Sequence, residues 1–435
     1  MFHVRHETAQ QLDTRGADAL EALIRKGYES FQPQIGVRLW NGGTIGDCSG
    51  PIVALNDPYA LSHLAFRPTL PTLVELWMEK AIDIENGTLF DLAKVKSAVK
   101  TRHALKRINK WEVAKALPAL FKLRRQSRLV RPQAGQGAGE SGSTQQAIQY
   151  HYDVSNDFYR LFLDENMVYS CGYFDGWHED IDKAQHDKLD MICRKLRLKP
   201  GERLLDIGCG WGALLIHATR FFGVTGHGVT LSQAQFDLAS QRIAAAGLED
   251  RITIELKPFQ QLQGEYDKIS SIGMFEHVGF AHHDEYFSTV HRLLKPRGLY
   301  LHHAITRPAK KTLRQFHKKS PEYRALTRLI FPGGELDYIG HSLQKLEAHR
   351  FEVHDVEAWR EHYARTCRLW AERLQQNFDT AIAMVGEPKA RLWLAYLAGC
   401  AISFERGDAL IFQTVASRKE KGPSQLGPTR RELYS

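Results

Sequence analysis

The clearest indication of the fold of this chain is the stretch Leu204-Leu-Asp-Ile-Gly-Cys-Gly-Trp-Gly212. Its apolar start predicts a short strand, and Gly208, Gly210 and Gly212 allow a tight turn in which a ligand approaches the backbone. The spacing G-x-G-x-G differs from the G-x-G-x-x-G of dinucleotide sites, and no G-x-x-x-x-G-K-[ST] phosphate loop occurs. An acid, Asp206, ends the strand just before the glycines. This combination indicates a ligand-binding turn more strongly than glycines alone.

The sequence around this turn alternates between short apolar strands and helices. Strands are expected at Arg203–Ile207, Thr225–Thr230, Ile252–Leu256, Tyr266–Ile272 and 299–305. Helices are expected at Ala213–Phe222, 233–246 and 283–294. Such alternation predicts an α/β fold with a mostly parallel, doubly wound sheet.

The length of 435 residues allows about two or three domains. The run Pro132-Gln-Ala-Gly-Gln-Gly-Ala-Gly-Glu-Ser-Gly-Ser-Thr144 is rich in Gly and Ser and predicts a flexible linker. The region before it is expected to be a smaller, mainly helical domain, with a helix at 17–26 and short strands at 37–40 and 52–55. The expected parts are an N-terminal domain (1–131), a linker (132–146), a catalytic domain (147–420) and a loose tail (421–435).

The composition excludes several classes of protein. A hydrophobic fraction of 43% is too high for a disordered, collagen-like or coiled-coil chain. Six scattered cysteines without a CxxC pair predict neither a disulfide framework nor a zinc ribbon, and they favour a reducing, cytoplasmic setting. No metal site is expected. The longest nearly uncharged apolar run, 392–403, is too short to span a bilayer.

The net charge of +8 is concentrated in two segments. The segment from Lys94 to Arg131 holds seven Lys and six Arg against the acid Glu112, a net charge of +12. The segment from Arg307 to Arg328 has a net charge of +7, so the rest of the chain is at −11. Such basic segments favour an anionic partner, either a membrane surface or nucleic acid.

The first basic segment also has the apolar spacing of amphipathic helices. Apolar residues recur every three or four positions between Val95 and Phe121. Pro118 is expected to kink or divide the second helix. A basic amphipathic helix is typical of a surface for anionic lipid, although a solvated face on a small domain has the same pattern.

The strand, acid and glycine turn resemble the first motif of class I S-adenosylmethionine (SAM)-dependent methyltransferases, whose sheet is Rossmann-like. In that family the turn contacts the amino acid end and ribose of the cofactor. This chain departs from the pattern at its second strand, which ends in Val229-Thr-Leu-Ser232 rather than in an acid. A hydroxyl or the nearby Gln235 would have to bind the ribose.

Further motifs narrow the resemblance. They are Tyr150-His-Tyr-Asp-Val-Ser-Asn-Asp157, Tyr169-Ser-Cys-Gly-Tyr173, Gly273-Met-Phe-Glu-His-Val-Gly279, Leu301-His-His-Ala-Ile305, Phe331-Pro-Gly-Gly334 and His362-Tyr363. In this order they resemble cyclopropane-fatty-acyl-phospholipid synthases and mycolic acid cyclopropane synthases, over about residues 147–417. The region before residue 132 resembles the extra domain of the phospholipid enzymes only loosely.

The resemblance implies methyl transfer from SAM to a cis double bond of a lipid acyl chain, followed by closure of a cyclopropane ring. A carbocation develops on the way, so water must be excluded, aromatic faces can stabilise the charge, and a base must remove a proton. In the family that base is bicarbonate. The residues that would hold it are Cys171, Glu276, His303, the backbone of Ile305, and Tyr363.

Three further residues lie near these positions or match the family, and each needs an assigned role. Alternation along a strand places His302 and His303 on opposite faces, and the motif register selects His303. His277, beside Glu276, is expected to be structural. Cys400 matches a cysteine regarded as a candidate active-site residue in the family, but its apolar helical setting favours a place in the core.

The resemblance also implies a set of cofactor-binding residues. They are Tyr169, Ser170, Asp206, Gly208, Cys209, Gly210, Gly212, Thr230, Leu231, Ser232, Gln235, Phe259 and Gln260. The basic segment that begins at Arg307 follows the strand of His303 and would suit lipid phosphates.

These observations predict a homodimeric enzyme, peripheral on the inner face of the membrane, that acts on unsaturated phospholipid in an anionic surface. No nucleic acid partner is expected. A relative that makes methylene- or methyl-branched chains stays open, as does a SAM methyltransferase acting on nucleic acid or a small molecule. A lipid-binding protein without activity is disfavoured by the complete set of matched residues.

Overall fold

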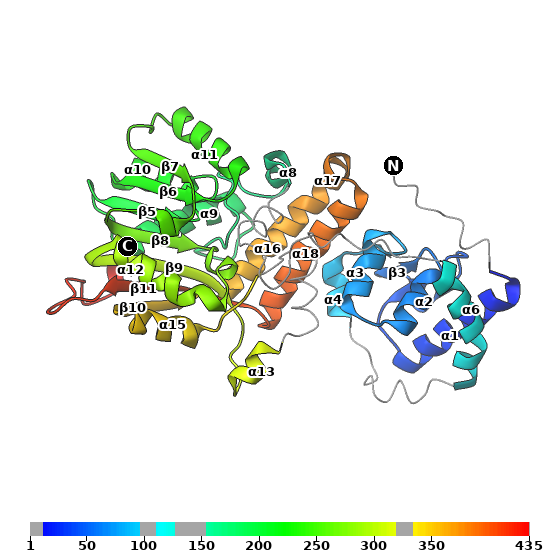
Figure 1. The fold of residues 1–435 in the computed structure, drawn as a ribbon. Coiled ribbons are helices and arrows are strands. Elements are labelled where there is room, and N and C mark those ends of the chain that lie inside the picture. The colour runs from blue at the N-terminus through cyan, green and yellow to red at the C-terminus, as the bar shows by residue number, and fades with distance from the viewer. Residues whose placement is uncertain (1–11, 96–109, 127–153, 319–333, 435) are drawn as a thin grey trace. The chain divides into compact units, whose positions relative to one another are not determined.

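The computed structural model describes residues 12–95, 110–126, 154–318 and 334–434 and divides the chain into two compact units (Figure 1). The first unit comprises Met1–Ala134, Ser320–Leu329 and Val385–Ala398, and the second comprises Gly135–Lys319, Ile330–Met384 and Gly399–Ser435. The expected linker, 132–146, lies outside the described residues. The domain bounds expected from the sequence therefore stay predictions.

The second unit is built on a seven-stranded sheet with the order β10-β11-β9-β8-β5-β6-β7. These strands are β5 (Arg203–Ile207), β6 (Thr225–Thr230), β7 (Ile252–Leu256), β8 (Tyr266–Ile272), β9 (Leu294–Thr306), β10 (Phe351–Ala358) and β11 (Leu410–Arg418). Strand β11 runs antiparallel to both of its neighbours, and the other adjacent pairs are parallel. The expected doubly wound, mostly parallel sheet is confirmed.

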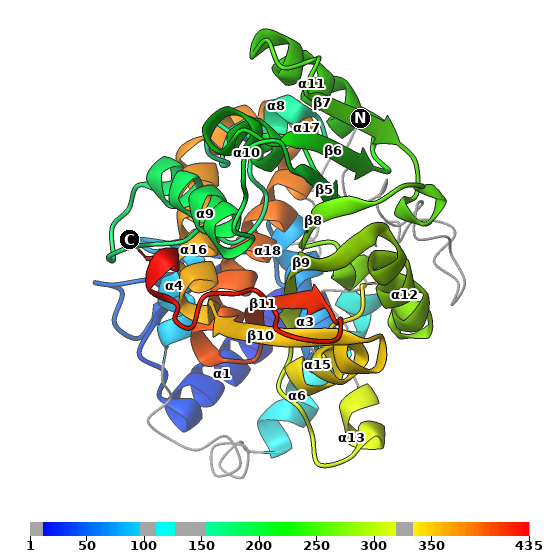
Figure 2. The same cartoon turned by 90° about the vertical axis from the view of Figure 1, so that its left-hand side faces the viewer.

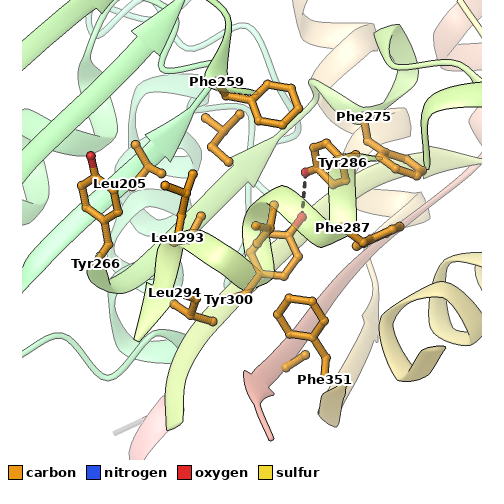
Figure 3. Close-up of a cluster of buried hydrophobic side chains, with 14 of the residues drawn as sticks. Leu205, Phe259, Tyr266, Phe275, Tyr286, Phe287, Leu293, Leu294, Tyr300 and Phe351 are labelled. Carbon is orange, nitrogen blue, oxygen red and sulfur yellow. Dashed lines mark hydrogen bonds between the residues drawn. The ribbon is translucent and has the colours of Figure 1, made fainter. Parts of the chain in front are cut away.

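Helices cover both faces of this sheet (Figure 2). On one face lie α9 (Ile181–Lys195), α10 (Ala213–Phe222) and α11 (Gln233–Ala245), and on the other lie α12 (His283–Leu293) and α15 (Ile339–Ala348). Figure 3 shows part of the core under α12, where the hydroxyls of Tyr286 and Tyr300 are hydrogen-bonded at 2.7 Å. This pairing satisfies two polar groups within an otherwise apolar core.

Most of the expected elements end within one residue of the observed ones, but β9 begins five residues earlier than expected. The turn-like sequence Pro296-Arg-Gly298 suggested that the strand starts only after it. In the structure Leu294 already pairs with Tyr266, and the register then shifts before the pair of Lys268 with Leu299. The irregularity absorbs the Pro and the Gly without ending the strand.

The first unit contains a small sheet and several helices. Its strands, in the order β2-β1-β3-β4, are β1 (Gly36–Arg38), β2 (Thr44–Ile45), β3 (Ile52–Leu55) and β4 (Ile82–Glu85). Its described helices are α1 (Thr14–Phe31), α2 (Tyr59–Phe66), α3 (Leu70–Met78), α4 (Leu89–Lys94) and α6 (Lys110–Gln126). The mainly helical character expected for this region is confirmed.

Helix α6 is the described part of the first basic segment, because residues 96–109 and 127–131 lie outside the described residues. It continues through Pro118, so the expectation that this proline divides the helix is wrong. Pro118 is exposed, whereas Ala116, Leu120 and Leu123 are buried against α1 and α2. Packing of this face outweighs the hydrogen bond that the proline removes.

The remaining described helices are α8 (Asn156–Arg160), α13 (Leu313–His317), α16 (Arg360–Gln376), α17 (Phe378–Val385) and α18 (Glu387–Arg406). The second basic segment is described only up to residue 318, and this part includes α13. No helix within the described ranges combines the length and apolarity that crossing a bilayer requires.

Candidate active site

A cavity of about 350 Å³ opens at the carboxyl ends of β5, β6 and β8. The expected cofactor-binding residues line it, except Gly212 and Ser232. Gly212 is the N-cap of α10, with φ of 80°, and the hydroxyl of Ser232 accepts a hydrogen bond from the Gln235 backbone at the start of α11. The structure therefore gives these two residues a role in helix capping.

The glycines of the turn are required by backbone conformation and by space. Gly208 and Gly210 have φ of 80° and 54°, which side-chain-bearing residues adopt at a cost. A Cβ on Gly208 would also lie 3.0 Å from the side chain of Met274. The cavity thus borders bare backbone, as a closely approaching ligand needs.

Asp206 places a buried carboxyl at the cavity. It accepts a hydrogen bond of 2.8 Å from Ser270, and burial raises its pKa to about 6. Lys188, on α9, lines the same cavity and donates to the Ser170 hydroxyl at 2.9 Å. Burial lowers the pKa of Lys188 to about 8. Lys188 was not predicted from the sequence, because a lysine within an amphipathic helix resembles any solvated lysine.

The second strand has a polar pair where the related methyltransferases have an acid. The hydroxyl of Thr230 donates to Oε1 of Gln235 at 2.7 Å, and both residues line the cavity. Since its Oε1 is occupied, Gln235 has its amide NH₂ left as a donor. The hydroxyl and Gln235 named from the sequence thus lie together, and their contact with a ribose stays a prediction.

Glu276 and Ile305 meet next to this cavity. Glu276 belongs to a 3₁₀ turn (Phe275–His277) after β8, and Ile305 lies near the end of β9. The backbone N–H of Ile305 donates to Oε1 of Glu276 at 2.6 Å. Burial raises the pKa of Glu276 to about 7, although this hydrogen bond acts in the opposite direction. The neighbouring His277, expected to be structural, lines the cofactor cavity.

The two histidines of β9 lie on opposite faces of the sheet, as expected. His302 hydrogen-bonds the Tyr300 hydroxyl at 2.9 Å inside the core under α12. His303 is fully buried on the other face, where its Nδ1 lies 2.9 Å from the amide nitrogen of Gln413. The choice of His303 is thus consistent with the geometry, and its role stays a prediction.

A chain of hydrogen bonds fixes the tautomer of His303. Lys195 donates to Oε1 of Gln413 at 2.8 Å, and it also binds Glu357. A lysine can only donate, so the oxygen of Gln413 faces Lys195 and its NH₂ faces His303. Nδ1 of His303 therefore accepts, and the imidazole proton lies on Nε2. Sequence spacing does not reveal Lys195 and Gln413, because they lie on α9 and β11.

Cys171 and Tyr363 are neutral hydrogen-bonding groups. The Cys171 thiol donates to the backbone oxygen of Gly172 at 3.2 Å, and the Tyr363 ring stacks on Phe404 at 4.6 Å. Burial raises the pKa of both groups well above the usual range. A thiolate or phenolate nucleophile is therefore disfavoured at these positions. Cys400 is partly buried on α18, so the expected core position holds only in part.

Aromatic rings connect these groups. Trp370 lies 5.2 Å from the ring of Tyr169, at the cofactor cavity, and 6.1 Å from the ring of Tyr363. Trp359 lies edge-on to His303 at 5.5 Å, and its backbone oxygen is 3.8 Å from the Cys171 sulfur. Trp370 thus contacts both Tyr363 and the ring of Tyr169 at the cofactor cavity, and Trp359 contacts both His303 and Cys171.

Replacing Glu276 by Gln is expected to change how stability depends on pH. Because the pKa of Glu276 rises from 4.5 to about 7 on folding, the native state holds an extra proton between these values. Wild-type stability therefore falls as pH rises through this window and levels off above it. Glu276→Gln cannot ionise, so it should gain up to about 3 kcal/mol over wild type between pH 5 and pH 8.

Urea unfolding at both pH values measures this difference. The exposed Glu372→Gln serves as the control and should track wild type at both pH values. An equal wild-type-to-variant difference for Glu276→Gln at pH 5 and pH 8 would contradict the raised pKa.

The chain is similar in sequence to enzymes named for the modification of fatty acyl chains. A probable fatty acid methyltransferase of Pseudomonas putida is 40% identical over 298 residues, covering 66% of this chain and 73% of the relative. The cyclopropane-fatty-acyl-phospholipid synthase of Escherichia coli K12 is 38% identical over 268 residues, covering 62% of this chain and 66% of the relative.

The chain is also similar to solved structures of cyclopropane synthases. A mycolic acid cyclopropane synthase complexed with SAH and CTAB matches with a TM-score of 0.60 and 36% identity, over 63% of this chain and 98% of that chain. The cyclopropane synthase MmaA2 of Mycobacterium tuberculosis matches with a TM-score of 0.59 and 33% identity, over 63% of this chain and 98% of that chain.

The family model for mycolic acid cyclopropane synthetase matches residues 140–414. This range includes the glycine turn, the cofactor cavity and all the predicted catalytic residues. The chain therefore belongs to the mycolic acid cyclopropane synthetase family and is a SAM-dependent methyltransferase.

Proposed function

We propose that this enzyme transfers the methyl group of SAM to a cis double bond in a phospholipid acyl chain and closes a cyclopropane ring. The observation that carries the proposal concerns two buried residues. Glu276 is next in the chain to His277, and His303 pairs in the sheet with Ile272, and both of these neighbours line the cofactor cavity. Oε2 of Glu276 and Nε2 of His303 have no hydrogen-bond partner among the described residues. Burying such atoms without partners is costly, so they favour a small polar ligand.

Bicarbonate fits these atoms chemically. Nε2–H of His303 is a donor for an anion oxygen, and Oε2 of Glu276 can accept from the bicarbonate hydroxyl. The Cys171 thiol and the Tyr363 hydroxyl are neutral, so they add no negative charge that would repel an anion. We infer that these side chains and the Ile305 backbone hold bicarbonate.

The proposed mechanism assigns a task to each part of the site. Bound SAM supplies the methyl group, and bound bicarbonate supplies the base that removes a proton after transfer. The rings of Trp370, Tyr363 and Trp359 can stabilise positive charge on the acyl chain. Their packing also excludes water, which would otherwise capture the cation. His303 and Glu276 hold the base in a fixed orientation.

Other products and substrates have less support. A branched chain stays the second candidate product, and the name of one relative, a probable fatty acid methyltransferase, is compatible with either product. Amine-methylating enzymes carry an N-P-P-Y type motif after the fourth strand, where this chain has Gly273-Met-Phe-Glu276. Methylation of a nucleic acid or a small molecule is therefore less well supported than cyclopropanation or branching of an acyl chain.

We further propose that α6 rests on an anionic membrane surface. The face of α6 opposite its buried residues exposes Trp111 and Phe121, at 75% and 52%. The exposed basic residues Lys115, Arg124 and Arg125 lie on the same helix. Apolar rings flanked by basic side chains match an interface between acyl chains and anionic headgroups. A peripheral location on the membrane follows from this proposal.

Expression in a host without cyclopropane lipids tests the proposed reaction. Unsaturated phospholipids should gain the mass of one CH₂, and ¹H NMR of the product should show ring methylene protons. The control is the same host expressing the Gly208→Val variant, whose added side chain blocks approach of the cofactor to the glycine turn. An unchanged lipid profile with folded, SAM-binding wild-type enzyme would contradict the proposal.

Gln413→Glu tests the positioning of His303. The new carboxylate keeps an acceptor for Lys195 but cannot donate to Nδ1, so the imidazole proton moves to Nδ1 or a second proton binds. We expect kcat to fall by about 10–100-fold with little change in SAM affinity. In ¹⁵N NMR the His303 signals should leave the pattern of the Nε2–H tautomer.

The exposed Gln376→Leu is the control for Gln413→Glu and should keep wild-type kcat. Wild-type kcat in Gln413→Glu, or an unchanged tautomer, would contradict the proposed chain from Lys195 to His303.

Vesicle binding tests the proposed role of α6. The double variant Lys115→Gln/Arg125→Gln should weaken binding to phosphatidylglycerol vesicles by about fivefold per charge at low salt. The difference should shrink at high salt because the charges are screened. Trp111→Ala should weaken binding at both salt concentrations. Trp177→Ala, at a residue 65% exposed in the second unit, is the control. Wild-type binding by both α6 variants would refute the proposed surface.

A further inference from the structure

A second cluster of ionisable side chains lies where α12 and α15 begin, outside the cavity described above. His283 is the first residue of α12, Asp337 lies just before α15, and His341 lies in its first turn. One possible ligand atom from each residue lies within 4.8 Å of the other two. The sequence predicted no metal. Between His283 and Asp337 lie 53 residues, and no spacing motif joins the three side chains.

The hydrogen bonds of this cluster leave one member unexplained. Nδ1 of His341 bonds Oδ1 of Asp337 at 2.9 Å, which satisfies both groups. His283 is only 1% exposed, and neither of its ring nitrogens has a hydrogen-bond partner among the described residues. The rings of Phe275 and Phe280, at 4.2 and 5.0 Å, hold the imidazole in place. Both nitrogens of this buried imidazole are thus available to a ligand, and they lie beside a carboxylate.

We propose that His283, Asp337 and His341 bind one divalent transition-metal ion, for which zinc is the best match. Two imidazoles and one carboxylate form a common protein ligand set for zinc. Such nitrogen ligands disfavour calcium and magnesium, which prefer oxygen. Water or a further protein group would complete the coordination.

Binding zinc requires the ligand atoms to move closer together. Zinc bonds of about 2.0–2.1 Å place neighbouring ligand atoms roughly 3.3 Å apart, so atoms that now lie as much as 4.8 Å apart must approach by up to about 1.5 Å. Coordination through Nδ1 of His341 would release its proton to solvent. Asp337 would stay oriented by the Ser342 hydroxyl at 2.8 Å and the Tyr338 backbone N–H at 2.7 Å. Such outer hydrogen bonds are typical supports of metal ligands.

The proposed metal would have a structural role. Glu335, two residues before Asp337, donates its backbone N–H to the backbone oxygen of Glu276 at 2.9 Å. Its carboxylate accepts from the backbone N–H of Phe280 at 2.9 Å. A metal that joins the starts of α12 and α15 would therefore fix the two segments that flank the Glu276 turn. The metal-binding proposal does not rest on the reaction proposed above.

Metal titration of the full-length, untagged protein tests the proposal. After removal of metal with a chelator, wild type should bind one equivalent of Zn²⁺ by calorimetry. Co²⁺ should give the visible absorption of a site with nitrogen ligands, and saturating Zn²⁺ should raise Tm. His341→Gln, at a partly exposed position, should weaken Zn²⁺ affinity at least about tenfold and abolish the rise in Tm.

Two further variants make the outcome decisive. If His283→Gln folds, it should show the same loss of Zn²⁺ affinity. If it does not fold, the result for His341→Gln decides the test. His178→Gln removes a member of a more exposed group, Asp175, His178 and Asp187, and should keep wild-type affinity. The proposal is overturned if wild type binds no Zn²⁺, if His341→Gln binds it unchanged, or if His178→Gln removes the binding.

Discussion

The removal of water from Glu276 and His303 is the constraint on which the rest of the site depends. Both side chains lie in a fully buried region, and each is held by one hydrogen bond, from the Ile305 backbone and from Gln413 respectively. Burial raises the pKa of Glu276 to about 7, so a carboxyl that is ionised in water becomes able to change its charge near neutral pH. The same dry interior would let a cation on a lipid chain last long enough to lose a proton.

The sheet supplies this environment. Residues at the carboxyl ends of β5, β6 and β8 form the cofactor cavity, and β9 carries His303 and Ile305, which we propose bind the base. Antiparallel β11 places Gln413 beside His303, and α9 contributes Lys195 behind it. The placement of a proton on Nε2 of His303 thus depends on three elements that are far apart in the sequence.

The sequence allowed prediction of whatever is encoded locally. The strand, acid and glycine turn at 203–212 predicted the sheet and most of the cofactor cavity, because each part follows from neighbouring residues. The strand alternation that separates His302 from His303 was predictable for the same reason. Lys188, Lys195 and Gln413 were not, since their function arises only when folding brings separate elements together. Pro118 was misjudged because packing of α6 on α1 and α2 outweighs the local preference of proline. The expected homodimer stays a prediction.

The central claim is that a base inside this site removes a proton from the transferred methyl group. Purified enzyme, unsaturated phospholipid vesicles and SAM with a fully deuterated methyl group test this claim directly, by mass spectrometry and NMR of the product. We predict a cyclopropane ring whose new carbon carries two deuterons, because one is lost to the base. A product with an intact trideuterated methyl branch would contradict it.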